Sequence, residues 1–160
     1  MHDTTKSAFS HRPDAYVATE GEFTGWRTWS HEGFVTNNGP FWQKQEDDGT
    51  IRCAFRAQRK HLNNFRHVHG GCLMAFADYC LFAFARPALQ MGGAVTTNFA
   101  CEFLDAGIEG DLIVGTGEVT RAGGSLIFLR GQLTAGERTL LTFSGTIKRI
   151  KRKPPPQPSA

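Results

Sequence analysis

The chain has 160 residues, 40% of them hydrophobic, which is enough for one domain with a buried core and too short for two comfortable ones. Its formal net charge of +3 is concentrated near the end: five of the 18 Lys and Arg residues lie between Lys148 and Lys153, and without them 13 cations face 15 anions. The basic balance therefore indicates a charged tail and argues against a nucleic-acid-binding face spread over the fold.

Composition divides the chain into three regions. Residues 1–20 are polar and aperiodic, which predicts a flexible N-terminal segment before a domain at 21–150. Residues 151–160 combine like charge with a proline run and predict a disordered tail. The start lacks the apolar stretch of a signal peptide, and the four scattered cysteines suit a reducing compartment, so we expect a cytoplasmic protein.

The first regular pattern is a hairpin in PFWQKQEDDGTIRCAFRA, residues 40–57. Two strand-like arms flank the turn residues DDGT, and apolar side chains alternate along the second arm from Ile51 to Ala57.

A helix follows, from Cys72 to Arg86, because no turn residue interrupts this run and Pro87 predicts its end. The run is apolar nearly all round, so other elements must wrap most of it. It is short for a bilayer span and contains Asp78, which favours a core helix and argues against membrane insertion.

Four later segments are rich in β-branched and aromatic residues and are separated by turn residues, which predicts four long strands in a meander: 92–104, 111–121, 125–135 and 138–150. A buried helix followed by an antiparallel sheet that curls around it is an α+β arrangement, the hotdog fold. A second copy normally covers the edge of such a sheet, so we expect a homodimer, with a dimer of dimers left open.

Asp78 is the strongest chemical signal, because a lone carboxylate in an apolar helix is costly to bury. It is a helix-surface acid at a solvated edge, a partner for a core donor or a catalytic group, and we favour the catalytic role. His69-Gly70-Gly71 precedes the helix, where unpaired N–H groups and the helix dipole can stabilise an oxyanion. Two glycines would also serve a tight turn.

The stretch HLNNFRHVHGGCLMAFAD resembles the active-site segment of the PaaI-like hotdog thioesterases, whose pattern is HxNxxGxxHGG followed by an Asp. The resemblance runs from about Gly39 to Lys148 and departs at Arg66, where the pattern has glycine. That position can require an unusual backbone conformation, so the loop could differ here. The matched residues are His61, Asn63, His69, Gly70, Gly71 and Asp78.

The resemblance implies that the Gly70 N–H and the Asn63 amide polarise a thioester carbonyl, while Asp78 activates water or attacks directly. His69 would shape the loop or assist the leaving thiolate. Thr96 matches a hydroxyl that helps to hold the water beside the acid.

The implied substrate is an aryl- or medium/long-chain acyl-CoA, so coenzyme A is part of the substrate and no cofactor is expected. Its phosphates need cationic or N–H partners. The candidates for CoA binding are Gly71, Arg66, Arg121, Gly124 and Ser125.

Three other functions fit parts of the sequence. His61, His67 and His69 could bind zinc, but hydrolytic zinc sites usually add a carboxylate or cysteine, so no metal is predicted. A non-catalytic acyl-CoA or lipid-binding module and an acyl-thioester dehydratase use the same fold. We favour the thioesterase because Asn63, the HGG motif and Asp78 occur together.

The spacing of the motif requires two chains. Gly70 and Asp78 are separated by about 12 Å along a helix, too far to serve one carbonyl. Two antiparallel helices across a two-fold axis would place Gly70 of one beside Asp78 of the other, giving two shared sites per dimer.

Overall fold

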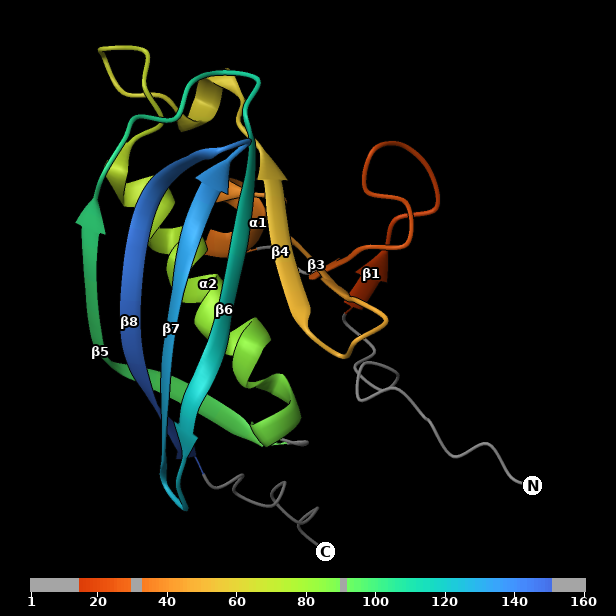
Figure 1. The fold of residues 1–160 in the computed structure, drawn as a ribbon. Coiled ribbons are helices and arrows are strands. Elements are labelled where there is room, and N and C mark those ends of the chain that lie inside the picture. The colour runs from red at the N-terminus through yellow and green to blue at the C-terminus, as the bar shows by residue number, and fades with distance from the viewer. Residues whose placement is uncertain (1–14, 30–32, 90–91, 151–160) are drawn as a thin grey trace, which may run out of the picture.

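The computed structural model describes residues 15–29, 33–89 and 92–150 (Figure 1). The predicted tail at 151–160 and most of the predicted N-terminal segment lie outside these residues. The elements are β1 (Ala15–Val17), β2 (Arg27–Trp29), α1 (Phe34–Asn38), β3 (Trp42–Gln45), β4 (Ile51–Arg56), a 3-10 turn (Arg59–His61), α2 (Gly70–Leu89), β5 (Gly93–Phe103), β6 (Leu112–Ala122), β7 (Leu126–Ala135) and β8 (Arg138–Ile150).

The eight strands form one antiparallel sheet, in the order β1-β2-β3-β4-β6-β7-β8-β5, that curls around α2 (Figure 1). This confirms the α+β hotdog fold. The predicted hairpin at 40–57 is confirmed as β3 and β4. Its turn is closed by the Glu46 N–H donating to the Thr50 carbonyl at 2.9 Å, and Gly49 adopts φ 84°, which favours glycine.

The four long strands do not form the predicted meander. β6, β7 and β8 are consecutive neighbours, but β5 pairs with β8, from Gly93 opposite Ile150 to Phe103 opposite Leu141. The reason is that β4 already pairs along β6, with Cys53 opposite Gly115, so β5 joins at the other side of the meander. β5, with 11 residues, therefore lies at the edge of the sheet.

Helix α2 continues through Pro87 to Leu89, so the prediction that Pro87 ends it is wrong. Proline has a φ compatible with a helix, and the missing N–H costs one bond in the last turn. The end of the helix is satisfied from outside, because Arg149 Nη1 donates to the Ala88 carbonyl at 2.5 Å and the Gly92 N–H donates to the Leu89 carbonyl at 3.0 Å.

The core lies between α2 and the concave face of the sheet. By length and apolar composition α2 could cross a membrane, and its burial within the sheet accounts for that composition. Glycines in the strands let the helix approach closely, since a Cβ on Gly117 would collide with Phe84 and one on Gly145 with Leu81. An aromatic cluster fills the β3–β4 side of the core: Phe41, Phe55, Phe76 and Tyr79.

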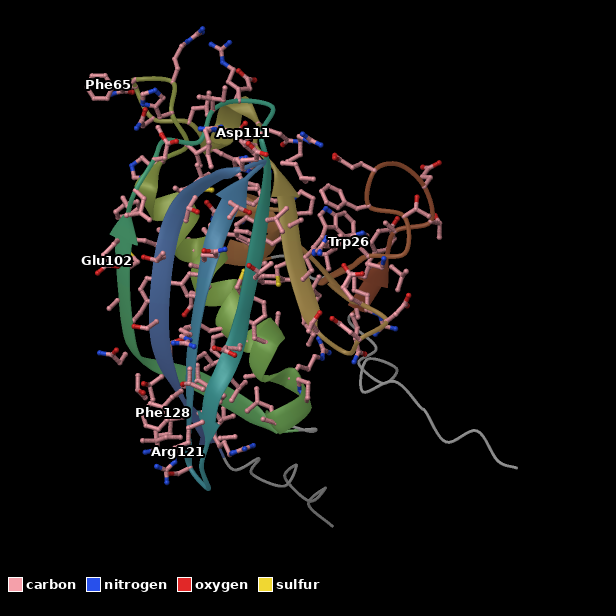
Figure 2. All side chains as sticks on the ribbon, viewed as in Figure 1. Trp26, Phe65, Glu102, Asp111, Arg121 and Phe128 are labelled. Carbon is pink, nitrogen blue, oxygen red and sulfur yellow. The ribbon has the colours of Figure 1, made fainter. Side chains whose placement is uncertain are left out.

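A short hairpin made by β1 and β2 extends the sheet beyond β3 and contains Trp26 (Figure 2). Arg27 pairs with Gln43 of β3, and the ring of Phe23 stacks on Trp42 with centroids 5.3 Å apart. The boundary expected at residue 20 falls within this hairpin. The sequence patterns predicted neither these strands nor α1.

Candidate active site

Three of the predicted catalytic residues lie along the side of α2 that faces β5. Gly70 begins the helix, Asp78 lies two turns later, and Thr96 belongs to β5. Thr96 Oγ1 donates to Asp78 Oδ1 at 2.6 Å, and a Cβ on Gly70 would lie 3.2 Å from the Phe103 ring. These two contacts show that β5 runs antiparallel beside α2, so both ends of the predicted site lie next to the edge of the sheet.

A β-bulge orients Thr96 toward the helix. The pairing of β5 with β8 shifts register between Thr96 and Asn98, and the Thr97 hydroxyl donates to the Thr146 carbonyl at 3.1 Å. An extra residue changes the alternation of side chains along a strand. As a result Thr96 contacts α2, and Phe99 again faces inward, where it stacks on Phe143.

The amide of Asn63 is presented by a rigid turn. Its Oδ1 accepts the Phe65 N–H at 2.9 Å and the His67 N–H at 3.1 Å, while its carbonyl accepts the Arg66 N–H at 3.0 Å. Because these bonds use the amide oxygen and so assign its orientation, the NH₂ group is the outward-facing half. Among the described residues this NH₂ has no acceptor, as a donor to a substrate carbonyl requires.

The backbone conformation of Arg66 explains why the family pattern has glycine at this position. Its φ is 63°, in the left-handed region that residues with a Cβ rarely occupy, and within 15–29, 33–89 and 92–150 it is the one non-glycine residue with positive φ. The turn thus keeps the conformation that glycine would adopt without strain. The long cationic side chain is exposed beside Asn63.

The three residues of the HGG motif make different contacts. His69 Nδ1 accepts the Gly71 N–H at 2.9 Å, which caps α2 and requires that the proton of the neutral ring be on Nε2. Gly71 permits this cap, because a Cβ there would lie 3.0 Å from Nδ1. The Gly71 amide is therefore occupied, whereas in the part of the chain that the structure describes the Gly70 N–H has no acceptor. Of the two glycines of the motif, Gly70 is thus the one whose N–H is free to bind a ligand.

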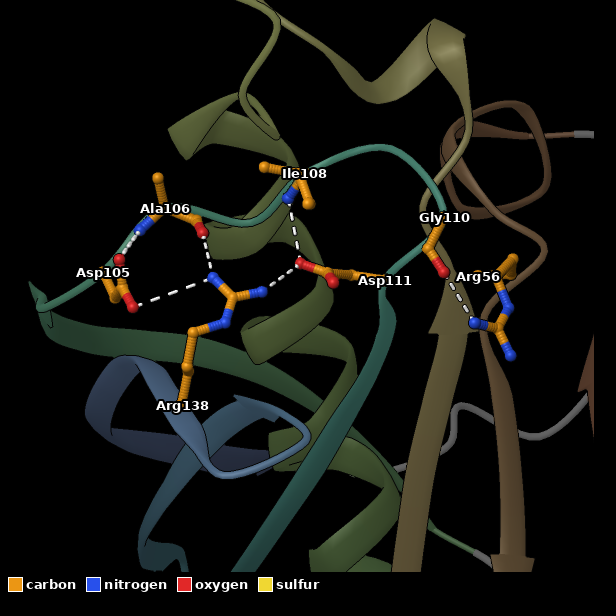
Figure 3. Close-up of polar contacts among 7 residues, drawn as sticks. All are labelled: Arg56, Asp105, Ala106, Ile108, Gly110, Asp111 and Arg138. Atoms are coloured by element: carbon orange, nitrogen blue, oxygen red, sulfur yellow. Dashed lines mark hydrogen bonds and ion pairs between the residues drawn. The ribbon is translucent and has the colours of Figure 1, made fainter.

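The segment between β5 and β6 supports the site loop. The Val68 N–H donates to the Gly107 carbonyl at 2.7 Å, which joins the residue before His69 to this segment. Arg138 holds the segment in place: it donates to the Ala106 carbonyl and pairs with Asp111, both at 2.7 Å (Figure 3). No local sequence pattern indicated this support, because it depends on a long-range contact.

His61 is buried and packed against the core. Its side chain is 4% exposed, its Nδ1 accepts the Gln58 N–H at 2.9 Å, and its ring packs edge-on against Phe55. Burial, together with the nearby charge of Lys60, lowers the pKa of His61. Within the described residues no three His, Cys, Asp or Glu side chains are arranged to hold a metal ion.

The residues predicted to bind CoA lie in two places. Arg66 and Gly71 are near Asn63 and the start of α2, whereas Arg121, Gly124 and Ser125 belong to or flank the β6–β7 turn at the other end of the helix. Figure 2 shows Phe65, next to Arg66, at one end of the molecule and Arg121 at the opposite end. One subunit alone does not bring the two sets together.

The geometry can be compared with known proteins. The sequence pattern of the thioesterase superfamily matches residues 65–142. A Pseudomonas aeruginosa protein named as an esterase is 31% identical over 110 residues, which cover 67% of this chain and 81% of that protein.

Solved structures share the fold. The PaaI protein of E. coli, from the phenylacetic acid degradation operon, superposes with a TM-score of 0.63 at 24% identity, covering 73% of this chain and 84% of that one. A Streptococcus mutans protein bound to acetyl-CoA superposes with a TM-score of 0.61 at 21% identity, covering 71% and 91%.

Proposed function

The chain belongs to the PaaI-like hotdog thioesterases of the thioesterase superfamily, and on that premise we propose that it hydrolyses acyl-CoA as a homodimer. The observation that carries the proposal is that the site combines two free N–H donors with a carboxylate held in place by a hydrogen bond. The Gly70 N–H and the Asn63 NH₂ lack acceptors among the described residues, and Asp78 is held by Thr96.

The chemistry follows from these groups. Gly70 and Asn63 donate hydrogen bonds to the thioester oxygen and stabilise the negative charge that develops there. Asp78 either removes a proton from water, which then attacks the carbonyl carbon, or attacks that carbon itself. When water attacks, the C–S bond breaks and the carboxylic acid is released directly. When Asp78 attacks, breaking the C–S bond leaves an anhydride between the acyl group and Asp78, and water then hydrolyses this anhydride to the carboxylic acid. In both routes the CoA thiolate takes up a proton, for which the Nε2–H of His69 is a candidate donor.

The partner subunit completes the site. Asp78 follows Gly70 by about 12 Å along α2, so the two residues of one chain cannot serve the same carbonyl. Support for pairing through β5 comes from its edge position and from the exposed apolar side chains there: Val95 is 45% exposed and Phe103 is 52% exposed. Antiparallel pairing of two β5 strands brings Gly70 of one chain toward Asp78 of the other.

We also propose a reducing, cytoplasmic setting for the protein. All four cysteines are free thiols, which agrees with a reducing cytoplasm. The acyl group is proposed to be aryl or medium- to long-chain, since the exposed ring of Phe103 lies beside Gly70.

A thiol-release assay across aryl, medium-chain and long-chain acyl-CoAs tests the function, with Asp78→Asn as the inactive control. We expect CoA release from at least one substrate and a loss of at least about a hundredfold in a folded Asp78→Asn protein. CoA binding without turnover would instead support the non-catalytic module. Hydration of an enoyl-CoA without thiol release would support the dehydratase.

A further inference from the structure

Arg149 joins three segments at the end of the molecule opposite Gly70. Its backbone N–H donates to the Ser125 carbonyl at 2.8 Å. Its guanidinium donates through Nη1 to the Ala88 carbonyl at 2.5 Å and through Nε to the Gly123 carbonyl at 3.4 Å. One partly buried side chain of β8 thus ties the last turn of α2 to the turn between β6 and β7.

Cations gather at this end of the molecule. The segments that form it, 87–89, 92–96, 119–128 and 146–150, contain no Asp or Glu in the sequence. They contain the cations Arg121, Lys148 and Arg149. The guanidinium of Arg149 is engaged with two carbonyl groups, so its part is to hold the turn in place.

The β6–β7 turn offers donors as well as charge. The Gly123 N–H donates to the Leu126 carbonyl at 2.8 Å and closes the turn. The N–H groups of Gly124 and Ser125 at its tip have no acceptor within the described residues. Exposed backbone N–H groups beside cations are a common way to bind phosphate.

We propose that Arg149 is a positioning residue that holds turn 123–125 in the conformation that receives the phosphates of the CoA nucleotide. The proposal rests on the proposed thioesterase function and extends it to the nucleotide end of the substrate. Arg149 acts through the turn and does not touch the reacting atoms.

The position of the turn fits the length of the substrate. From Asp78 to Ala88, which Arg149 contacts, α2 rises about 15 Å. That is comparable with an extended pantetheine arm. The turn would therefore serve the same site as Asp78 of its own chain, with the thioester at one end of the arm and the phosphates at the other. Gly70 and Asn63 of the partner subunit would complete this site.

The test compares two substrates that differ only in the nucleotide: an acyl-CoA and the corresponding acyl-pantetheine. Arg149→Gln and Arg149→Lys should each raise KM for acyl-CoA roughly tenfold while kcat changes less than about twofold. Lysine keeps the charge but cannot bond two carbonyls with a planar fork, so both variants should behave alike. KM for acyl-pantetheine should not rise in either variant.

A matched control is Arg130→Gln, which removes an exposed cation on the outer face that is paired with Glu118. It should leave KM and kcat unchanged for both substrates. Calorimetry should show the same selectivity, with weaker binding of CoA and unchanged binding of pantetheine in the Arg149 variants. If Arg149→Gln does not fold, Ser125→Asp provides the second test, because an acid in the turn should raise KM more for acyl-CoA than for acyl-pantetheine.

Three results would overturn the inference. A wild-type KM in Arg149→Lys would show that charge alone matters, and an equal rise in KM for acyl-pantetheine would show general damage. No effect of Ser125→Asp would exclude the turn from the phosphate site. A wild-type protein that hydrolyses neither substrate would refute the proposed function itself, which is a distinguishable outcome.

Discussion

Thr96 Oγ1 donates to Asp78 Oδ1 at 2.6 Å, so the hydroxyl of an edge strand fixes one oxygen of the half-buried carboxylate on α2. Among the described residues the other oxygen, Oδ2, has no partner. The carboxylate is therefore oriented by one oxygen while the other is left for water or substrate.

Thr96→Val should lower kcat about tenfold with little change in KM, because it removes the bond that orients Asp78 without changing the volume of the side chain. Thr96→Ser retains the hydroxyl and should recover most of the loss. The measurement is thiol release under saturating acyl-CoA. Equal losses in the Val and Ser variants would mean that the methyl group, and not the hydroxyl, is needed.

Mixing two inactive variants should restore activity if the site is shared. Gly70→Pro removes the donor at the first helical position, which tolerates proline, and the exposed Phe103 ring can shift to admit it. Asp78→Asn removes the acid. Random reassociation makes half the dimers mixed, each with one intact site, so about a quarter of wild-type activity should return.

Each parent variant must first be shown by sedimentation to be folded and dimeric. A mixture that contains heterodimers but remains as inactive as its parents would show that Gly70 and Asp78 do not meet across the interface.

Arg66→Gly should raise the free energy of unfolding by about 0.5–1 kcal/mol, because the strain released at φ 63° exceeds the entropy that glycine adds to the unfolded chain. Arg66→Ala is the matched control: it removes the guanidinium but keeps the strained backbone, so its stability should stay within about 0.5 kcal/mol of wild type. Urea unfolding measures both. If Ala stabilises as much as Gly, the side chain and not the backbone is the source.

Stability should fall as the pH drops below the ordinary pKa of histidine. Burial lowers the pKa of His61 from 6.5, so below that pH the unfolded chain binds a proton that the folded chain does not, and the free energy of unfolding decreases. The contribution is fully present above 6.5 and is lost as the pH falls through the lowered value.

His61→Asn keeps an acceptor for the Gln58 N–H and should reduce the difference in urea midpoint between about pH 7.5 and about pH 5.5. His67→Asn, at an exposed position of the same loop, should leave that difference as it is in wild type. An unchanged slope in His61→Asn would assign the pH dependence to other groups.

Local sequence patterns predicted the elements whose side-chain periodicity reflects burial on one face. The apolar run of α2 and the alternation in β3, β4 and the later strands were visible in the sequence, because burial imposes those periods. The pairing of β5 with β8 was not predictable, since several strands of similar composition compete for each neighbour. β1 and β2, at three residues each, are too short to give a period.

The candidate site, too, could be predicted only where a local motif marks it. Residues 61–78 could be found from their motif. Thr96, which the resemblance singled out, bonds to Asp78, while its role in holding a water stays a prediction. Lys148 and Arg149 were counted with the basic tail, yet both belong to β8. The role of Arg149 depends on Ala88 and Gly123, which are distant in sequence, so charge counting could not reveal it.

The β1–β2 hairpin also affects assembly. A sheet with two long open edges can add copies at both sides and grow into an open-ended ribbon. Here β1 ends the other side of the sheet with three residues, whereas β5 offers 11. Among the described strands the sheet therefore has one long open edge. The two-fold contact proposed above would bury that edge in both copies, so assembly would stop at a closed pair.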